Sequence, residues 1–347
     1  MKQNTLVFRS SALALSMRVK RRVFAVLLLL VIVTLTAMVV SIAQGEYPIP
    51  PFAVVQTVLG FETKADYAFV VNTLRLPRTL VACLVGIALA ISGAIMQGIT
   101  RNPLADPGII GINAGASLAA VSLIVLFPNI PVGFLPFCAF GGAVAVSLLI
   151  YFLAWEGGSS PLRLILIGVG VATVIGAATN VIVTFGEINS VTQAFVWLAG
   201  SVYGRSWEQV FAFLPWLMVF LPLALIKARQ LNTMALGDDT AQGLGCHIEW
   251  QRGWLLLIST ALAGAAVATA GTIGFVGLMA PHMARQLVGS TYGGLIPVSG
   301  MMGAMLVVAA DLIGRMLFAP IEIPCGIVTA IIGAPYFVYL LLRQRRQ

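Results

Sequence analysis

Residues 74–115 read LRLPRTLVACLVGIALAISGAIMQGITRNPLADPGIIGINAG, and this stretch decides the fold of the chain. It opens with two arginines around a proline and continues with about 20 apolar residues, enough for a helix to cross a bilayer. The apolar run breaks at Arg101-Asn102-Pro103 and again at Asp106-Pro107-Gly108. The stretch therefore predicts a membrane-spanning helix with a charged start and an irregular end.

Small residues recur at every fourth position of this predicted helix, at Gly86, Ala90, Ala94 and Gly98. That spacing places them in one stripe, where the backbone of another helix can approach closely. Lipid supplies little hydrophobic drive between helices, so we expect close packing of such stripes to hold the molecule together.

A similar stripe occurs in a later apolar run, at Gly168, Ala172, Gly176 and Asn180. Because it ends in a polar side chain, this stripe is our candidate for the wall of a transport pathway. Plain packing between helices is the alternative, and it is the commoner use of such a stripe.

The composition points to the membrane for the whole chain. Of its 347 residues, 59% are hydrophobic and only 9% are charged, whereas a soluble domain carries about 25% charged residues. We therefore predict an all-α, polytopic membrane protein that contacts membrane lipid. Its net charge of +8 is explained by topology, so we expect no nucleic-acid partner. The four cysteines show no CxxC spacing, and we expect neither a disulfide framework nor a metal site.

Apolar runs mark eight clear spans, and one further interval, Gly253–Ser290, fits either one long crossing or two short ones. The clear spans are Val23–Ala43, Thr79–Ile99, Ile109–Leu126, Phe134–Leu153, Leu164–Val183, Gln209–Ile226, Leu295–Leu312 and Ile323–Leu342.

The distribution of positive charge resolves the ambiguous interval. Met1–Arg22 holds six Lys and Arg residues, and the C-terminal end is also basic, so the positive-inside rule places both termini in the cytoplasm. The polar interval Lys227–Arg252 then also lies inside, and an even number of crossings must follow it. Two short crossings, Trp254–Ala270 and Thr272–Val288, bring the total to ten. We divide the chain into a cytoplasmic extension, 1–22, and one transmembrane domain, 23–347.

Glycines and a proline suggest an internal repeat. Residues 86, 93, 103, 111 and 115 recur as the same residue types at 264, 271, 281, 289 and 293, a constant spacing. Internal duplication is common in transporters, but coincidence is the alternative in a chain with 35 glycines. The sequence leaves the orientation of such a repeat open.

Five basic residues, Lys64, Arg75, Arg78, Arg205 and Arg315, fall on the outer side of this topology, against the positive-inside rule. Of these, Arg75 and Arg78 come just before one predicted helix and Arg315 ends another. Contact with lipid phosphates is one explanation. The other is a docking surface for an acidic partner, because a guanidinium pairs bidentately with a carboxylate. Asp311 also lies four residues before Arg315, a spacing that favours an ion pair along a helix.

The cytoplasmic interval contains NTMALGDDTAQGLGC, residues 232–246. Gly237 can end one short helix and Asp238 can cap the next, which presents Ala241 and Leu244 on one side. Such a pair of amphipathic helices can fit a groove on a soluble partner, although an ordinary surface loop has the same composition. Gly/Pro breaks at Thr100–Pro107 and Gly157–Pro161 lie on the same side; they suit a gate or tight turns.

Several activities are disfavoured by what the sequence lacks. Few polar groups lie within the spans, and they form no chain of carboxylates for proton transfer, which argues against an ATP-independent secondary transporter. No paired catalytic groups at membrane depth support an intramembrane enzyme. No GxxxxGK[ST] sequence occurs, so the chain does not bind ATP in that way.

Several long motifs occur in order between Leu74 and Leu342: LRLPRTL, ISGAIMQGITRNPLADPGIIG, ALGDDTAQGLG, GTIGFVGLMAPHMAR, ADLIGR and IPCGIVTAIIGAPYFVYLL. Through them the chain resembles the FecCD family, the permease subunits of type II ABC importers for iron–siderophores, haem and cobalamin. The resemblance implies ten transmembrane helices and a second permease, identical or paralogous. It also implies two cytoplasmic ATPase subunits and a substrate-binding protein on the outer face.

The resemblance also implies roles for individual residues. By position, Arg75 and Arg315 match arginines that receive glutamates of the binding protein, with Arg78 a weaker candidate. The ATPase-coupling segment contains Leu236, Gly237, Asp238, Asp239, Ala241, Leu244 and Gly245. The cytoplasmic gate contains Asn102, Pro103, Ser159, Ser160 and Pro161.

The implied function is import of an iron(III)–siderophore complex across a bacterial inner or cytoplasmic membrane by alternating access. Haem or cobalamin import by the same architecture is the alternative. The permease itself is expected to catalyse no reaction and to bind no cofactor, with ATP and Mg²⁺ held by the partner ATPase.

Overall fold

The protein, a computed structural model, is described at residues 5–10, 15–61, 64–156, 158 and 160–344. Over these residues it is almost entirely helical. The helices are α1 (Arg21–Ala43), α2 (Pro51–Val58), α3 (Ala65–Phe69), α4 (Leu76–Thr100), α5 (Ile112–Leu126), α6 (Leu135–Leu153), α7 (Pro161–Phe185), α8 (Ile188–Leu198), α9 (Trp207–Ile226), α10 (Ala228–Met234), α11 (Asp238–Gly243), α12 (Ile248–Ala270), α13 (Val276–Val288), α14 (Tyr292–Met316) and α15 (Cys325–Gln344).

Short turns and one hairpin complete the described elements. A π-helical turn, Val70–Arg75, leads into α4, and 3₁₀ turns lie at Pro107–Ile110 and Val132–Phe134. Two antiparallel strands, β1 (Thr5–Ser10) and β2 (Leu15–Lys20), precede α1. The predicted all-α fold is confirmed, and this hairpin is an exception in a segment that the sequence left unassigned.

The ten predicted spans correspond to ten helices. Eight helices of the described chain are long and apolar enough to cross a membrane, and α5 and α13 are shorter. The ambiguous interval divides at Gly271, whose positive φ of 72° ends α12. The division into two helices is confirmed, but α12 is not short: it begins at Ile248 and has 23 residues. By contrast, α13 has only 13 residues.

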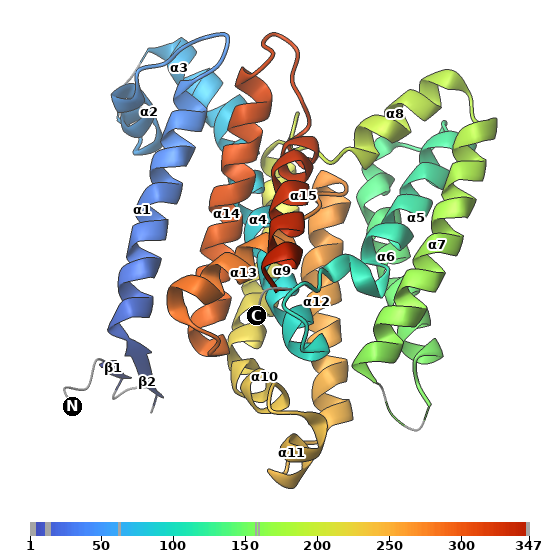
Figure 1. The fold of residues 1–347 in the computed structure, drawn as a ribbon. Helices are drawn as coiled ribbons and strands as arrows, with labels where there is room; N and C mark the ends of the chain where they lie inside the picture. The colour runs from blue at the N-terminus through green and yellow to red at the C-terminus, as the bar shows by residue number, and fades with distance from the viewer. Residues whose placement is uncertain (1–4, 11–14, 62–63, 157, 159, 345–347) are drawn as a thin grey trace.

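The molecule has two distinct ends (Figure 1). Helices α2 and α3 lie at the top of the view, with α8 at the same level, and α10 and α11 lie at the bottom with the hairpin. We call these the α2–α3 end and the α10–α11 end. Helix α1 stands at one edge and α7 at the other, while α4 runs through the interior. Most of the apolar stretch of α4 is buried, as expected for the central helix of a bundle.

The central contact is between α4 and α14, and glycines make it close. Gly86 and Gly303 face each other so tightly that a Cβ on either would overlap the backbone carbonyl of the other. At the α10–α11 end of the same contact, Gly98 faces the ring of Tyr292. All four residues of the first predicted stripe are buried, which confirms that small side chains hold this helix pair together.

The repeat exists at the level of helices but not at the constant spacing read from the sequence. Gly93 lies inside α4 whereas Gly271 lies beyond the end of α12, and Pro103 is in a loop whereas Pro281 is inside α13. The groups α4–α7 and α12–α15 nevertheless pack reciprocally, α4 against α14 and α12 against α6. Because α4 runs away from the α2–α3 end and α12 runs toward it, the repeat is inverted.

Candidate functional site

Two arginines at the α2–α3 end hold the last turn of α1. Arg75 donates from Nη1 to the carbonyl of Ile42 at 2.7 Å and from Nη2 to that of Tyr47 at 2.8 Å. Arg315 donates to the carbonyl and hydroxyl of Ser41. The last carbonyls of a helix lack partners and form the negative end of its dipole, so they attract cations.

The same two arginines keep their positive charge. A backbone carbonyl is neutral, and among the described residues neither Arg75 nor Arg315 forms an ion pair with a carboxylate. Both side chains are partly exposed. The α2–α3 end therefore presents two guanidinium groups in fixed positions that no ion pair engages among the described residues, an arrangement suited to an acidic partner.

Arg78 is different, and the structure gives it another role. Its guanidinium forms a bidentate contact with the buried carboxylate of Asp311, the shorter distance being 2.7 Å from Nη2 to Oδ1. Its Nη1 lies 2.9 Å from Oε2 of Glu322. Two carboxylates neutralise this buried arginine, so we no longer include it in the docking surface.

The expected ion pair between Asp311 and Arg315 is replaced by this contact. Helix α14 packs antiparallel to α4, and that packing brings Asp311 opposite Arg78. Arg315 instead turns toward Ser41. Spacing along α14 made a pair of Asp311 with Arg315 feasible, but the packing of α14 against α4 gave Asp311 a different partner, Arg78.

At the α10–α11 end, two arginines share one carboxylate. Asp238, the first residue of α11, lies 3.0 Å from Nη2 of Arg252 and 3.4 Å from Nη2 of Arg101. Arg252 belongs to α12 and is fully buried, whereas Arg101 ends α4 in the left-handed conformation. Asp238 thus connects α11 to both α12 and the loop after α4.

The predicted capping of α11 is corrected by this geometry. Gly237 occupies the N-cap position with φ of 106°, and α10 has already ended at Met234. Asp238 lies inside the first turn, where a negative charge is favourable, and makes no capping hydrogen bond. The backbone takes this path because glycine alone adopts such a φ without strain.

The coupling segment exposes different residues from those expected to act together. Leu244 is 66% exposed and Leu236 is also exposed, but Ala241 is completely buried. The prediction that Ala241 and Leu244 share one presented side is therefore wrong. Asp239 and Gly245 are exposed with the two leucines, and Thr240, Gln242 and Gly243 between them are exposed as well.

The first predicted gate segment is a compact turn that folds back against α4. The side-chain oxygen of Asn102 accepts the backbone N–H of Leu104 at 2.9 Å, and Pro103 lies within this turn. Gln97 donates to the carbonyls of Ala105 and Leu278, which ties the turn to α13. The turn is therefore held to both α4 and α13.

The second gate segment is only partly described. Ser160 is the N-cap of α7 and Pro161 its first residue, where the missing N–H of proline does no harm. Ser159 and Gly157 lie outside the described residues. Gly158 approaches the carboxylate of Glu249, so this segment lies beside the start of α12, at the α10–α11 end.

The predicted pathway stripe divides into two parts. Gly176 and Asn180 line a cavity of about 370 Å³ together with Asn113, Ser117 and Thr272. Gly168, by contrast, packs against the carbonyl of Ile109. Ala172 does not line the cavity. Gly168 thus serves helix packing, while Gly176 and Asn180 face a space with small and polar walls.

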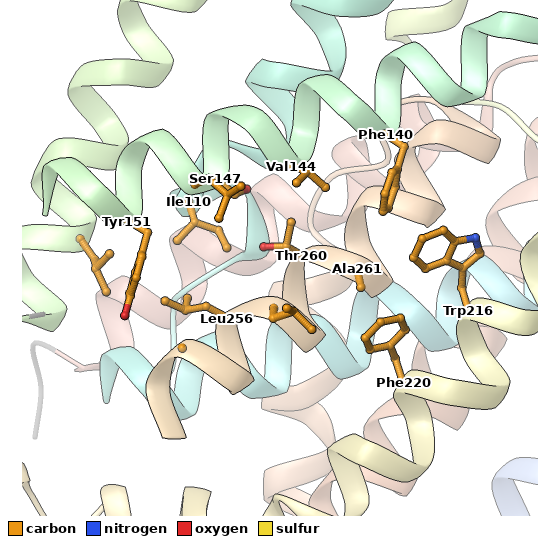
Figure 2. A pocket seen from close by; sticks show the side chains of 14 residues that line it. Ile110, Phe140, Val144, Ser147, Tyr151, Trp216, Phe220, Leu256, Thr260 and Ala261 are labelled. Carbon is orange, nitrogen blue, oxygen red and sulfur yellow. The ribbon is translucent and has the colours of Figure 1, made fainter. Parts of the chain in front are cut away.

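A second cavity lies between α6, α9 and α12, with a volume of about 400 Å³ (Figure 2). Phe140, Trp216 and Phe220 crowd one end of it, and Tyr151 lies at the other. Apart from the hydroxyls of Ser147, Tyr151 and Thr260, its walls are apolar. Such walls cannot replace the hydration of a polar metal chelate, so we exclude it as a substrate site.

Sequence reasoning missed several residues of these sites. Arg101 and Arg252 were identified only as charges, although Arg101 directly follows the decisive helix. Asn113 and Ser117 sit four residues apart in a mostly apolar run, a helical spacing that was available as a signal. Among the described residues, no three His, Cys, Asp or Glu side chains gather into a metal site.

An inverted repeat of apolar helices, a polar cavity and charged surfaces at the two ends define a class of membrane protein, the transport permeases. A model of the FecCD transport family matches residues 24–343. The chain belongs to this family, whose members are permease subunits and not enzymes.

Individual relatives agree with this assignment. The chain is 45% identical over 332 residues, 94% of its length and 96% of the relative's, to "Probable siderophore transport system permease protein YfhA" of Bacillus subtilis. It is 41% identical to "Hemin transport system permease protein HmuU" of Yersinia pestis, over 79% of this chain and 83% of that protein. A solved metal-chelate type ABC transporter in an inward-facing conformation matches with a TM-score of 0.83 and 29% identity, covering 92% of this chain and 99% of that one.

Proposed function

We propose that this chain is the permease subunit of an ATP-driven importer that carries an iron(III)–siderophore complex across the inner or cytoplasmic membrane of a bacterium. The observation that carries the proposal is the asymmetry of the two ends in a FecCD-family chain. One end presents two arginines that form no ion pair among the described residues, and the other presents a short helical segment with exposed leucines. The 45% identity to a siderophore permease supports the substrate class.

The α2–α3 end faces outward in this proposal, and the α10–α11 end faces the cytoplasm. Six Lys and Arg residues in Met1–Arg22 and the basic C-terminus place both termini inside by the positive-inside rule. The extension 1–22 is then cytoplasmic, and residues 23–347 form one transmembrane domain. Lys227, Arg229 and Arg252 lie on the same side.

A substrate-binding protein docks at the α2–α3 end. The side chains of Arg75 and Arg315 already point in fixed directions, because each donates hydrogen bonds to backbone carbonyls at or just after the end of α1. Preorganised guanidinium groups lose little side-chain freedom when a carboxylate arrives. One glutamate or aspartate from each lobe of a bilobed binding protein gives one ion pair per arginine.

Two cytoplasmic ATPase subunits, one for each permease, engage the segment around α10 and α11. Leu236 and Leu244 supply apolar contacts for a groove, as an amphipathic helix does. Asp238 then passes displacement of α11 to α12 through Arg252 and to the gate turn through Arg101. ATP and Mg²⁺ belong to the partner subunits, and this chain holds neither cofactor.

A second permease, identical or paralogous, completes the pathway beside α7. Four large apolar residues of α7, Leu162, Leu166, Val169 and Val174, are each more than half exposed. Next to them Gly176 and Asn180 line the polar cavity. A wall of small and weakly polar residues suits passage, since tight binding would trap the substrate. In alternating access, the pathway lined by this wall opens first toward the binding protein and then toward the gate turns.

Haem is the main alternative substrate, because a relative at 41% identity is a hemin permease; cobalamin is a further one. An ATP-independent secondary transporter is less well supported. Asp311 is engaged by Arg78, so it is not the free intramembrane carboxylate that ion-coupled transport needs.

The test is transport by the reconstituted complex. Proteoliposomes with the permease, its ATPase and its binding protein are offered iron(III) on hydroxamate, catecholate and citrate chelators, and also haem and cobalamin. We expect ATP-dependent accumulation of at least one iron(III) chelate. Accumulation of haem or cobalamin alone would identify the alternative, and uptake without ATP would refute the proposed class. A reporter fused near Gly243 is expected on the cytoplasmic side.

A further inference from the structure

One arginine at the α2–α3 end has no role in docking, coupling or packing. Arg205 lies in the loop between α8 and α9, where its backbone N–H is bonded to the carbonyl of Val202. Its side-chain Nε is buried without an acceptor, and within the described chain no carboxylate forms an ion pair with its guanidinium. Burial also lowers the pKa of this guanidinium, because charge is removed from water.

The side chain lines a cavity of about 380 Å³, a size typical of small-ligand sites. Ser190, Gln193 and Ser201 add polar groups to the walls, and Trp197 and Tyr203 add aromatic faces. A buried donor without an acceptor is costly, and the unpaired Nε of this cationic side chain makes the cavity suited to an anion. Aromatic faces beside it suit a planar or ring-bearing ligand.

This cavity continues the candidate pathway. On α5, Asn113 and Ser117 line the pathway cavity, and Ile124 lines the Arg205 cavity two turns further along a similar face. The end of α12 also joins them: its last residue, Ala270, lines the Arg205 cavity, and Thr272, two residues further on, lines the pathway cavity. A ligand that leaves the Arg205 cavity therefore has the polar pathway cavity as its neighbour.

The cavity also adjoins the docking end. The ring of Tyr203 lies 5.5 Å from the guanidinium carbon of Arg78, which places the cavity beside the neutralised arginine cluster. A binding protein held by Arg75 and Arg315 would thus release its cargo near Arg205. We propose that the Arg205 cavity is a receiving site for the anionic, carboxylate- or catecholate-bearing part of the transported chelate.

The inference rests on the proposed function and is tested by charge selectivity. The complex, in nanodiscs of zwitterionic lipid, is titrated with radiolabelled ferric citrate in the absence of the binding protein. We expect saturable binding that weakens about tenfold in Arg205→Gln, the usual scale for loss of one charge-assisted contact. Arg205→Lys should restore most of it, and Lys64→Gln, which removes a charge at the same end, should have no effect.

Transport then separates this inference from the proposed function. Supplied with saturating binding protein, Arg205→Gln should import an anionic chelate roughly tenfold more slowly but a neutral trihydroxamate chelate at an unchanged rate. Equal loss for both chelates, or no loss for either, overturns the receiving site while import itself still supports the permease. No saturable binding to the wild type also overturns it. So does binding that vanishes when the nanodiscs contain phosphatidylglycerol, because the cavity then holds a lipid headgroup.

Discussion

The two ends of the molecule use arginine in opposite ways. At the α2–α3 end, Arg75 and Arg315 bind neutral backbone carbonyls and keep their charge. At the α10–α11 end, Arg101 and Arg252 converge on one carboxylate, that of Asp238. The first arrangement is the one proposed to receive an acidic partner, while the second joins three segments of the same chain. The chemical identity of the acceptor therefore distinguishes a docking arginine from a connecting one.

Arg78 tests this rule within one end. It is only three residues from Arg75, yet it is buried between Asp311 and Glu322. Sequence position alone grouped the two arginines together, whereas their acceptors separate them.

Reversing both docking charges should abolish the outer complex. For Arg75→Glu with Arg315→Glu, we expect the affinity for the binding protein to fall by roughly a thousandfold, because each lost charged contact costs about 2–5 kcal/mol. Affinity is measured by biolayer interferometry on the permease–ATPase complex. Lys64→Glu, at an exposed lysine of the same end, is the control. Undiminished docking with intact ATPase assembly would refute the role of the two arginines.

Neutralising Arg78 should affect folding rather than docking. Arg78→Gln leaves the carboxylate of Asp311 buried without its cation, and we expect a loss of about 3–5 kcal/mol in the free energy of unfolding. The loss is measured by detergent titration in mixed micelles. Adding Asp311→Asn removes the stranded charge and should recover most of it. A stable Arg78→Gln variant that fails to bind the binding protein would contradict the distinction drawn here.

A charge on the coupling surface should weaken attachment of the ATPase without affecting the fold. Leu244 is 66% exposed, so Leu244→Glu should change stability by less than about 0.5 kcal/mol. If Leu244 fills a groove, ATPase affinity should fall about 30-fold, the scale of an interface hot spot. Leu59 has the same exposed fraction at the α2–α3 end, and Leu59→Glu is the matched control. Equal ATPase binding by both variants contradicts the coupling assignment.

Much of the fold followed from simple patterns. The apolar runs, the charge distribution and the Gly86 stripe predicted ten helices and a central, closely packed one, since all three depend on local spacing and on the bilayer. The features that sequence patterns did not predict are contacts between residues far apart along the chain. The partner of Asp311 lies 233 residues away, and the inverted repeat relates helices whose residues do not align at one spacing. No local pattern encodes either.

The sites divide in the same way. Exposure of Leu244 and burial of Ala241 depend on which side of α11 meets the rest of the chain, and four residues of sequence cannot decide that. Asp238 was identified as a helix cap, but its importance comes from two arginines that approach from α4 and α12. The identity of charged residues was readable from the sequence, while their acceptors were not.

The smallest expected effect is the sharpest test of the connecting role. Arg101→Gln removes a partly exposed contact, so stability should change by only about 0.2–1 kcal/mol. Asp238 is proposed to transmit movement of α11 to the gate turn through Arg101. In that case the number of chelates imported per ATP hydrolysed should fall about threefold, because loss of one of two connections lowers the coupling free energy by roughly 0.7 kcal/mol.

Arg163 is the matched control: its side chain is 37% exposed, as is that of Arg101, and it pairs with Glu156 away from α11. Arg163→Gln should leave the ratio unchanged. If both variants lower the ratio equally, the loss reflects removal of positive charge at this end; if only Arg101→Gln lowers it, the connection through Asp238 carries the coupling.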